Sequence, residues 1–169
     1  MRTKGFLSLA WLLPFLGACS AAESSTPLFT VAELEPRIDE LNGQTVRVVG
    51  YLRECRGYDC TLYSQKSDAD ARADAVARAL AEERQNKQPT SLPEFPEVGI
   101  GSGEAFEFDA EAAAFTASYV VITGNVANEC RHEGKRGCTD RSPDLHPTGI
   151  TAWKGPVPPP PQSPNGRAT

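Results

Sequence analysis

The stretch from residue 42 to residue 60, NGQTVRVVGYLRECRGYDC, decides the fold. It opens with an Asn-Gly turn signal, and a β-branched run follows. In that run Val46, Val48 and Leu52 fall on one face, because successive side chains of a strand point to opposite faces. Gly50 lies in the middle, where a strand bends or bulges. The stretch therefore predicts one long strand that is kinked near its centre.

The same pattern returns late in the chain, in VVITGNV at residues 120–126. Four positions match in type and offset, as the pairs Val46/Val120, Val48/Ile122, Gly50/Gly124 and Leu52/Val126. Each of the two strands runs into a loop that begins at a cysteine, Cys55 in the first and Cys130 in the second. Two long, glycine-kinked strands of this kind indicate a small closed barrel.

Shorter segments complete the set of expected elements. We expect strands at residues 44–54, 61–65, 98–102, 118–128 and 149–153. We expect helices at residues 30–41, 67–87 and 108–115, the first of them with a capping box made by Thr30 and Glu33. The alanine-rich helix at 67–87 should be a solvated insertion between the second and third strands, and a partner-binding helix is the alternative.

Strand, strand, strand, short helix, strand, strand is the order of the OB-fold, and the chain from about residue 42 to 154 is similar to that fold. The similarity includes the opening pattern Gly43-x-x-Val46-x-Val48-x-Gly50-x-Leu52. It implies a mainly β domain with α insertions, namely a small five-stranded OB-like Greek-key barrel. A swapped α+β sheet is the alternative.

The N-terminus has the features of an export signal. Arg2 and Lys4 precede an apolar stretch at residues 6–15, and Leu16-Gly17-Ala18-Cys19 follows it. This segment resembles the lipobox of bacterial lipoproteins. A membrane-spanning helix is the poorer explanation, because spanning requires about 20 apolar residues and Pro14 interrupts this run.

The lipobox resemblance implies that residues 1–18 are removed and that Cys19 becomes a lipidated N-terminus bearing acyl chains such as palmitate. Ser20 follows the cysteine, which implies sorting to the outer membrane, with the domain facing the periplasm. The mature chain then consists of a tether at 19–28, a domain at 29–154 and a Pro-rich tail at 155–169 that we expect to be disordered.

The charge of the mature chain bears on its partners. Removal of Arg2 and Lys4 leaves 15 basic against 22 acidic side chains, a net charge of −7. A general nucleic-acid binder needs a basic surface to neutralise phosphates, so nucleic acid is not an expected partner.

Four cysteines remain after Cys19, and in an exported chain an even number predicts disulfides. Four cysteines allow three connectivities. We favour Cys55–Cys60 and Cys130–Cys138, because each pair closes its own loop at short spacing. Neighbouring antiparallel strands would hold Cys55 and Cys130 at opposite ends, which disfavours a crossed bridge.

The cysteine-bounded loops follow the first and fourth expected strands, where OB-folds tend to bind ligands. Their basic and aromatic side chains suit an anionic or glycan ligand. These candidate ligand-binding residues are Arg53, Arg56, Tyr58, Arg131, Lys135, Arg136 and Arg141. The alternative is that exposed loops simply present solvated charges.

We expect no metal or cofactor. Cys130, His132, Cys138 and His146 are of the residue types that bind zinc, but their spacing lacks a close pair and an oxidising compartment competes for the thiols. Ser102 lies in a glycine-rich segment that does not fit the G-x-S-x-G pattern of hydrolases.

The sequence therefore predicts a non-catalytic, membrane-anchored envelope lipoprotein that acts as a binding or interaction module. Two alternatives remain. One is a structural assembly partner that docks through the helix at 67–87 or the Pro-rich tail, and the other is a divergent envelope hydrolase.

Overall fold

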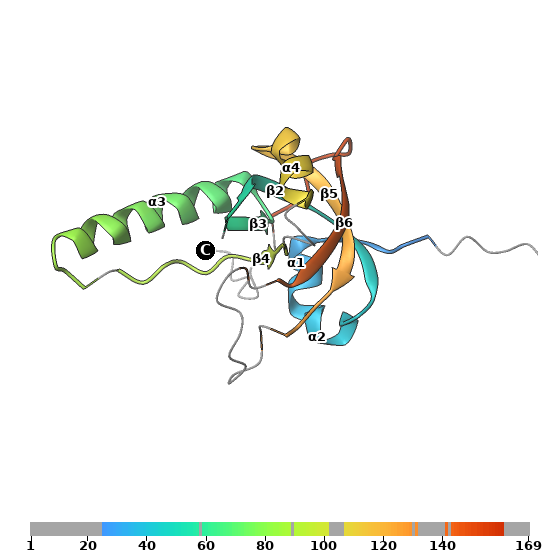
Figure 1. The fold of residues 1–169 in the computed structure, drawn as a ribbon, viewed down its shortest axis with the longest axis horizontal. Helices are drawn as coiled ribbons and strands as arrows, with labels where there is room; N and C mark the ends of the chain where they lie inside the picture. The colour runs from blue at the N-terminus through green and yellow to red at the C-terminus, as the bar shows by residue number, and fades with distance from the viewer. Residues whose placement is uncertain are drawn as a thin grey trace, which may run out of the picture.

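The computed structural model describes residues 25–57, 59–88, 90–101, 107–129, 131, 141 and 143–160. These residues form a mainly antiparallel, six-stranded sheet with short helices and one long helix (Figure 1). The strand order is β4-β3-β2-β5-β6, and β1 pairs in parallel with β2. The strands are β1 (Leu28–Thr30), β2 (Thr45–Arg56), β3 (Asp59–Tyr63), β4 (Glu97–Gly99), β5 (Ser118–Val126) and β6 (Leu145–Ala152).

The two similar segments of sequence pair with each other at the centre of the sheet. β2 and β5 run antiparallel from Thr45 opposite Asn125 to Leu52 opposite Ser118, with Val48 opposite Ile122 near the middle. Both mid-strand glycines are needed for close approach. A Cβ atom on Gly50 would lie 2.6 Å from Leu62 Cγ, and one on Gly124 would lie 2.4 Å from the His146 carbonyl oxygen.

The inward faces of these strands form one apolar core. Val46, Val48, Leu52, Leu62 and Ile122 are all fully buried in it, as their alternation along the strands predicts. The register between β2 and β3 shifts between Leu52 and Cys55, so the predicted irregularity of the first strand lies beyond Gly50.

The two ends of the strand order meet. Ile100, directly after β4, forms a parallel bridge with Leu145 at the start of β6. The Gly101 N–H donates to the Leu145 carbonyl at 2.9 Å, and the Asp144 N–H donates to the Gly99 carbonyl at 2.9 Å.

A broken helix covers one side of the core. It comprises α1 (Val31–Leu34), the 3₁₀ turn η1 (Glu35–Arg37) and α2 (Ile38–Leu41). The predicted capping box is confirmed, since the Glu33 N–H donates to Thr30 Oγ1 and the Thr30 N–H donates to Glu33 Oε2. The break falls at Pro36, because proline lacks the N–H that an α-helix needs there.

Several predicted boundaries are wrong. β1 was not predicted, and it takes up Leu28, the last residue of the expected tether. β4 begins at Glu97 rather than at residue 98. β6 begins at Leu145 rather than at residue 149 and contains Pro147, which lies where the register with β5 shifts. At a register shift the regular hydrogen bonds between the strands are interrupted, so Pro147, which has no N–H, is tolerated there.

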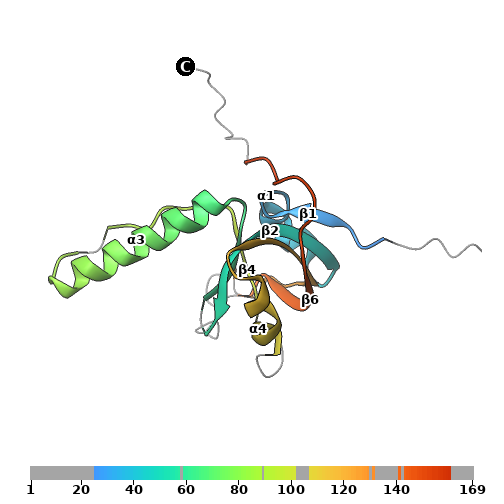
Figure 2. The same cartoon turned by 90° about the horizontal axis from the view of Figure 1, so that it is seen from above.

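The long helix α3 (Lys66–Arg84) is inserted between β3 and β4, as the sequence predicts. It extends away from the sheet as an arm, and the chain after it runs back alongside (Figures 1 and 2). Two of its side chains, Ala69 and Ala75, are buried. The N-cap residue is Gln65, and it makes no capping bond through its side chain.

A shorter helical segment follows β4, where the sequence predicts a helix at 108–115. It consists of α4 (Glu107–Ala112) and the 3₁₀ turn η3 (Ala113–Phe115), and it buries Phe108 and Ala112. No helix in the described part of the chain is long and apolar enough to cross a membrane.

The first residues of the Pro-rich tail, expected to be disordered from residue 155, are packed against the sheet. Pro158 is buried, and its carbonyl accepts a hydrogen bond of 2.6 Å from Gln65 Nε2. The Trp153 indole N–H donates to the Pro156 carbonyl at 2.8 Å. Proline has no N–H, but its carbonyl still accepts, so side chains of the domain can hold such a segment.

Because no residue of α3 belongs to the main apolar core, shortening the helix should leave the sheet folded. Replacing residues 70–88 with a short Gly/Ser linker should preserve one cooperative thermal transition and lower Tm by no more than about 5 °C. Loss of that transition in circular dichroism would show that the arm belongs to the core.

Candidate functional site

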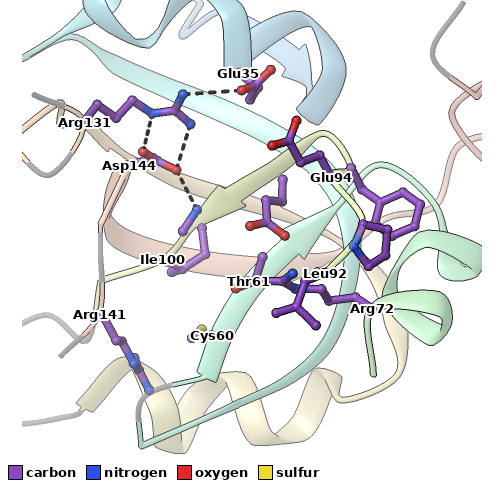
Figure 3. A pocket seen from close by; sticks show the side chains of 14 residues that line it. Glu35, Cys60, Thr61, Arg72, Leu92, Glu94, Ile100, Arg131, Arg141 and Asp144 are labelled. Atoms are coloured by element: carbon purple, nitrogen blue, oxygen red, sulfur yellow. Dashed lines mark hydrogen bonds and ion pairs between the residues drawn. The ribbon is translucent and has the colours of Figure 1, made fainter. Parts of the chain in front are cut away.

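The outer face of β3 and β4 is hollowed. A pocket of about 700 Å³ lies between these strands, the chain that returns from α3, and η1 (Figure 3). Its lining side chains include Thr61, Arg72, Leu92, Glu97 and Asp144.

A second pocket of about 530 Å³ adjoins the first along the same strands. It shares Thr61, Arg72 and Glu97 with the first pocket, so the two form one continuous depression that we call the β3–β4 groove. α3 forms one wall of this groove through Val76 and Leu80.

The floor of the groove follows from the alternation of β3. Cys60 and Leu62 point into the core and are buried, so Thr61 and Tyr63 point outward. Glu97 on β4 lies opposite Tyr63 in the register. The floor of the groove therefore carries the Thr61 hydroxyl, the Tyr63 phenol and the Glu97 carboxylate.

Exposed apolar side chains line the wall. Val76 is 37% exposed, Leu80 50% and Leu92 37%, which is high for large aliphatic residues. Val76 and Leu80 lie one turn apart on the same face of α3. The groove therefore offers apolar surface beside its polar floor.

Burial perturbs the acidic groups of the groove. Loss of water raises the pKa of Glu97, the neighbouring Asp144 and Asp59 raise it further, and Arg72 opposes this. Burial, with the nearby Glu97 and Asp59, raises the pKa of Tyr63 to about 12. Burial likewise raises the pKa of Asp59.

Arg131 lines the groove but is engaged within the chain. Its Nε donates to Asp144 Oδ1 at 2.7 Å, and its Nη2 donates to Asp144 Oδ2 at 3.1 Å. Its Nη1 lies 3.4 Å from Glu35 Oε1, as the dashed lines of Figure 3 show. The hydrogen bond with Asp144 raises the pKa of Arg131. Asp144 Oδ2 also accepts from the Gly99 N–H, so this network joins η1, β4 and the start of β6.

Arg141 is engaged more tightly still. Its side chain is 6% exposed, and its two terminal nitrogens donate to the two oxygens of Asp109 at 2.7 and 2.6 Å. Its Nε donates to the Gly57 carbonyl at 2.7 Å. Arg141 therefore fastens α4 to the turn between β2 and β3.

The other candidate residues are less constrained. Arg53 lines the groove, and Arg56 is 83% exposed with its Nε 3.0 Å from Glu54. Tyr58, Lys135 and Arg136 lie outside the described residues. The structure thus brings Arg53, Arg131 and Arg141 to one groove, and each of them is already paired with a carboxylate, Arg53 with Glu54 at 3.8 Å.

The predicted Cys55–Cys60 disulfide is confirmed. The two residues face each other in the register of β2 and β3, with 4.1 Å between their Cα atoms. Cys130 and Cys138, the second predicted pair, lie outside the described residues, as does His132 of the rejected zinc site. His146 Nε2 lies 3.5 Å from Glu129. Where the chain is described, no group of three or more His, Cys, Asp or Glu side chains is placed to hold a metal ion.

The sequence did not predict the groove. Two signals for it were present, namely the alternation of β3 and the spacing of Arg72, Val76 and Leu80 along one face of the expected helix. What could not be read from the sequence was that Val76 and Leu80 of α3 would line the same pocket as Thr61 of β3 and Glu97 of β4. Comparisons with protein-family models, curated proteins and solved structures found no match to this chain.

Because Arg141 is paired with Asp109, removal of the Arg141 side chain should lower the stability of the fold substantially. Arg141→Ala leaves Asp109, whose side chain is only 15% exposed, without its partner and should lower the free energy of unfolding by about 3 kcal/mol. The matched variant Arg56→Ala removes an exposed guanidinium and should change it by less than about 0.5 kcal/mol. Urea denaturation measures both, and equal effects would contradict the structural role of Arg141.

The raised pKa of Glu97 predicts a pH dependence of stability. The folded chain holds this proton more tightly than the unfolded chain, so the free energy of unfolding falls as pH rises above 4.5, the ordinary value. Glu97→Gln should match the wild type at about pH 3.5 and exceed it in stability at about pH 7. Glu83→Gln, at an exposed position on α3, is the control. A Glu97→Gln protein that is less stable than wild type at neutral pH would show that the carboxylate is favourably paired.

Proposed function

We propose that this chain is a non-catalytic binding module of the bacterial cell envelope. In this proposal a lipid on Cys19 holds it at the outer membrane, on the periplasmic side. The domain binds a segment of a partner protein in the β3–β4 groove, and the observation behind this is the continuous groove with apolar walls and an acidic floor.

The proposal includes an OB-like barrel as the scaffold. Three observations support it: the order β4-β3-β2-β5-β6, the parallel bridge between Ile100 and Leu145, and the position of α4 between β4 and β5. In an OB-fold with this correspondence, β3 and β4 are the second and third strands, whose face is the usual binding surface. The groove lies on that face.

The chemistry of the groove favours a polypeptide with apolar and basic side chains. Six carboxylates line it against four guanidiniums: Glu35, Glu54, Asp59, Glu94, Glu97 and Asp144 against Arg53, Arg72, Arg131 and Arg141. Asp144 and Glu35 engage Arg131, and Asp109 engages Arg141. An anionic or glycan ligand would have to compete with these internal pairs, whereas a basic side chain meets complementary charge.

The direction of the groove suits a tethered receptor. The N-terminal end of the described chain leaves the domain on the side opposite α3 in both views (Figures 1 and 2). A domain tethered there presents α3 and the β3–β4 groove away from the anchor, toward other proteins of the envelope.

The anchor is tested at Cys19. The Cys19→Ala precursor should remain uncleaved, because the lipoprotein peptidase requires the lipidated cysteine, and at most a few per cent should be released from the membrane fraction. Cys55→Ala is the control, since it removes a different cysteine and leaves the lipobox intact. A Cys19→Ala protein that is cut and soluble in the periplasm at wild-type levels would contradict the anchor.

The partner is tested by photo-cross-linking in cells. A photoreactive side chain at Leu80 or Leu92, both exposed in the groove, should give a discrete adduct with a protein. The same side chain at Thr148, exposed on β6, should give none.

A charge reversal sharpens this test. Glu97→Lys should lower the yield of the Leu80 adduct about tenfold, the effect of losing ~1.4 kcal/mol of binding. The matched reversal Glu129→Lys lies away from the groove and should leave the yield unchanged. No adduct from the groove, or equal adducts from Thr148, would contradict the proposed site.

A further inference from the structure

A second exposed apolar surface lies at β1, the first strand of the chain, and at the segment that follows β6. Leu28 is 43% exposed and Val157 57% exposed. They line a shallow hollow of about 250 Å³ together with Phe29, Val49 and Trp153. We call these five residues the β1–tail patch. The patch brings together the first strand and the segment after the last strand, which are far apart in sequence.

The polar groups at this patch are satisfied within the chain. The Trp153 indole N–H donates to the Pro156 carbonyl at 2.8 Å. The ring can therefore be transferred from water to an apolar medium with its N–H still hydrogen-bonded. Glu33 at the rim accepts bonds from the Thr30 N–H and hydroxyl at 2.8 and 2.9 Å. The surface can therefore enter an apolar medium at little cost in unmet hydrogen bonds.

Three basic residues neighbour the patch, and one of them, Arg37, also forms an ion pair with Glu40 at 2.8 Å. Arg47 lies opposite Leu28 in the register of β1 and β2, and Lys154 follows Trp153. The Arg37 guanidinium carbon lies 5.2 Å from the centroid of the Phe29 ring. Aromatic and aliphatic side chains rimmed by basic ones are the composition that binds the interface of an anionic bilayer.

The length of the tether brings the patch to the membrane. Eight residues lie between Cys19 and Leu28, so the chain from one to the other spans at most about 30 Å when fully extended. A lipid on Cys19 therefore keeps the patch at high effective concentration next to the bilayer, where even a weak affinity suffices.

We infer that the β1–tail patch is a second membrane contact, which inserts shallowly into the lipid interface beside the anchor. The inference rests on the proposed lipidation of Cys19. Two contacts with the bilayer restrict the orientation of the domain more than the lipid on Cys19 does alone. The β3–β4 groove is then held facing away from the bilayer.

Trp153 offers a direct test. The sequence has two tryptophans, and Trp11 is lost with the signal peptide, so Trp153 is the one fluorophore of its kind in the mature chain. The lipidated mature protein is reconstituted into vesicles of phosphatidylethanolamine and phosphatidylglycerol, with or without brominated acyl chains. Brominated lipid should remove about half or more of the Trp153 emission, because the ring lies at the depth of the interface.

Two variants serve as controls. The double variant Leu28→Ser, Val157→Asp should stay anchored but lose most of the quenching. Leu80→Ser, exposed on α3, should be quenched like the wild type. An anchored protein whose emission is the same with and without bromine overturns the inference and leaves the anchor standing. A protein that does not stay with the vesicles overturns both.

Discussion

The antiparallel pairing of β2 with β5 is the constraint on which the rest of the structure depends. β2 also pairs with β3 through its second half and with β1 through its first half, so one strand sets the register of three neighbours. A slip of one residue would turn the buried face of β2 to solvent. Gly50 and Gly124 allow no such shift without collision, because a side chain would have to take the place of each glycine.

The β2–β5 pair lies at the centre of the sheet, with β3 and β4 on one side of it and β6 on the other. On the β3 side, the Cys55–Cys60 disulfide ties the end of β2 to β3, and α3 and its return segment wall the β3–β4 groove. On the β6 side, the residues after Trp153 cross the sheet, and Pro158 is held by Gln65 at the base of α3. Tyr119 links both sides, since its hydroxyl donates to Gln65 Oε1 and accepts from the Lys66 N–H.

What the sequence predicted well was local, and what it missed was tertiary. The pairing of two similar strands, the Thr30–Glu33 capping box and the Cys55–Cys60 pair each depend on residues near in sequence or on a repeated pattern. Arg131 and Arg141 stood out as cations for a ligand, yet both meet carboxylates from distant segments. The groove was missed for the same reason, because its walls come from elements that sequence periodicity cannot place against each other.

The packing of α3 bears on the proposed binding role of the groove. The helix has 19 residues and buries two alanines, so packing against the sheet contributes little to its stability. Local pairs such as Lys66 with Asp70 add only a few tenths of a kcal/mol each. Val76 and Leu80 are 37% and 50% exposed, so part of each side chain still lies in water in the free domain. Covering this exposed part would contribute roughly 0.5–1.5 kcal/mol for each residue, in proportion to the value for burying a whole Val or Leu side chain. The free domain packs weakly against α3, and a bound partner that covers Val76 and Leu80 would stabilise it. This property suits α3 to the proposed binding role.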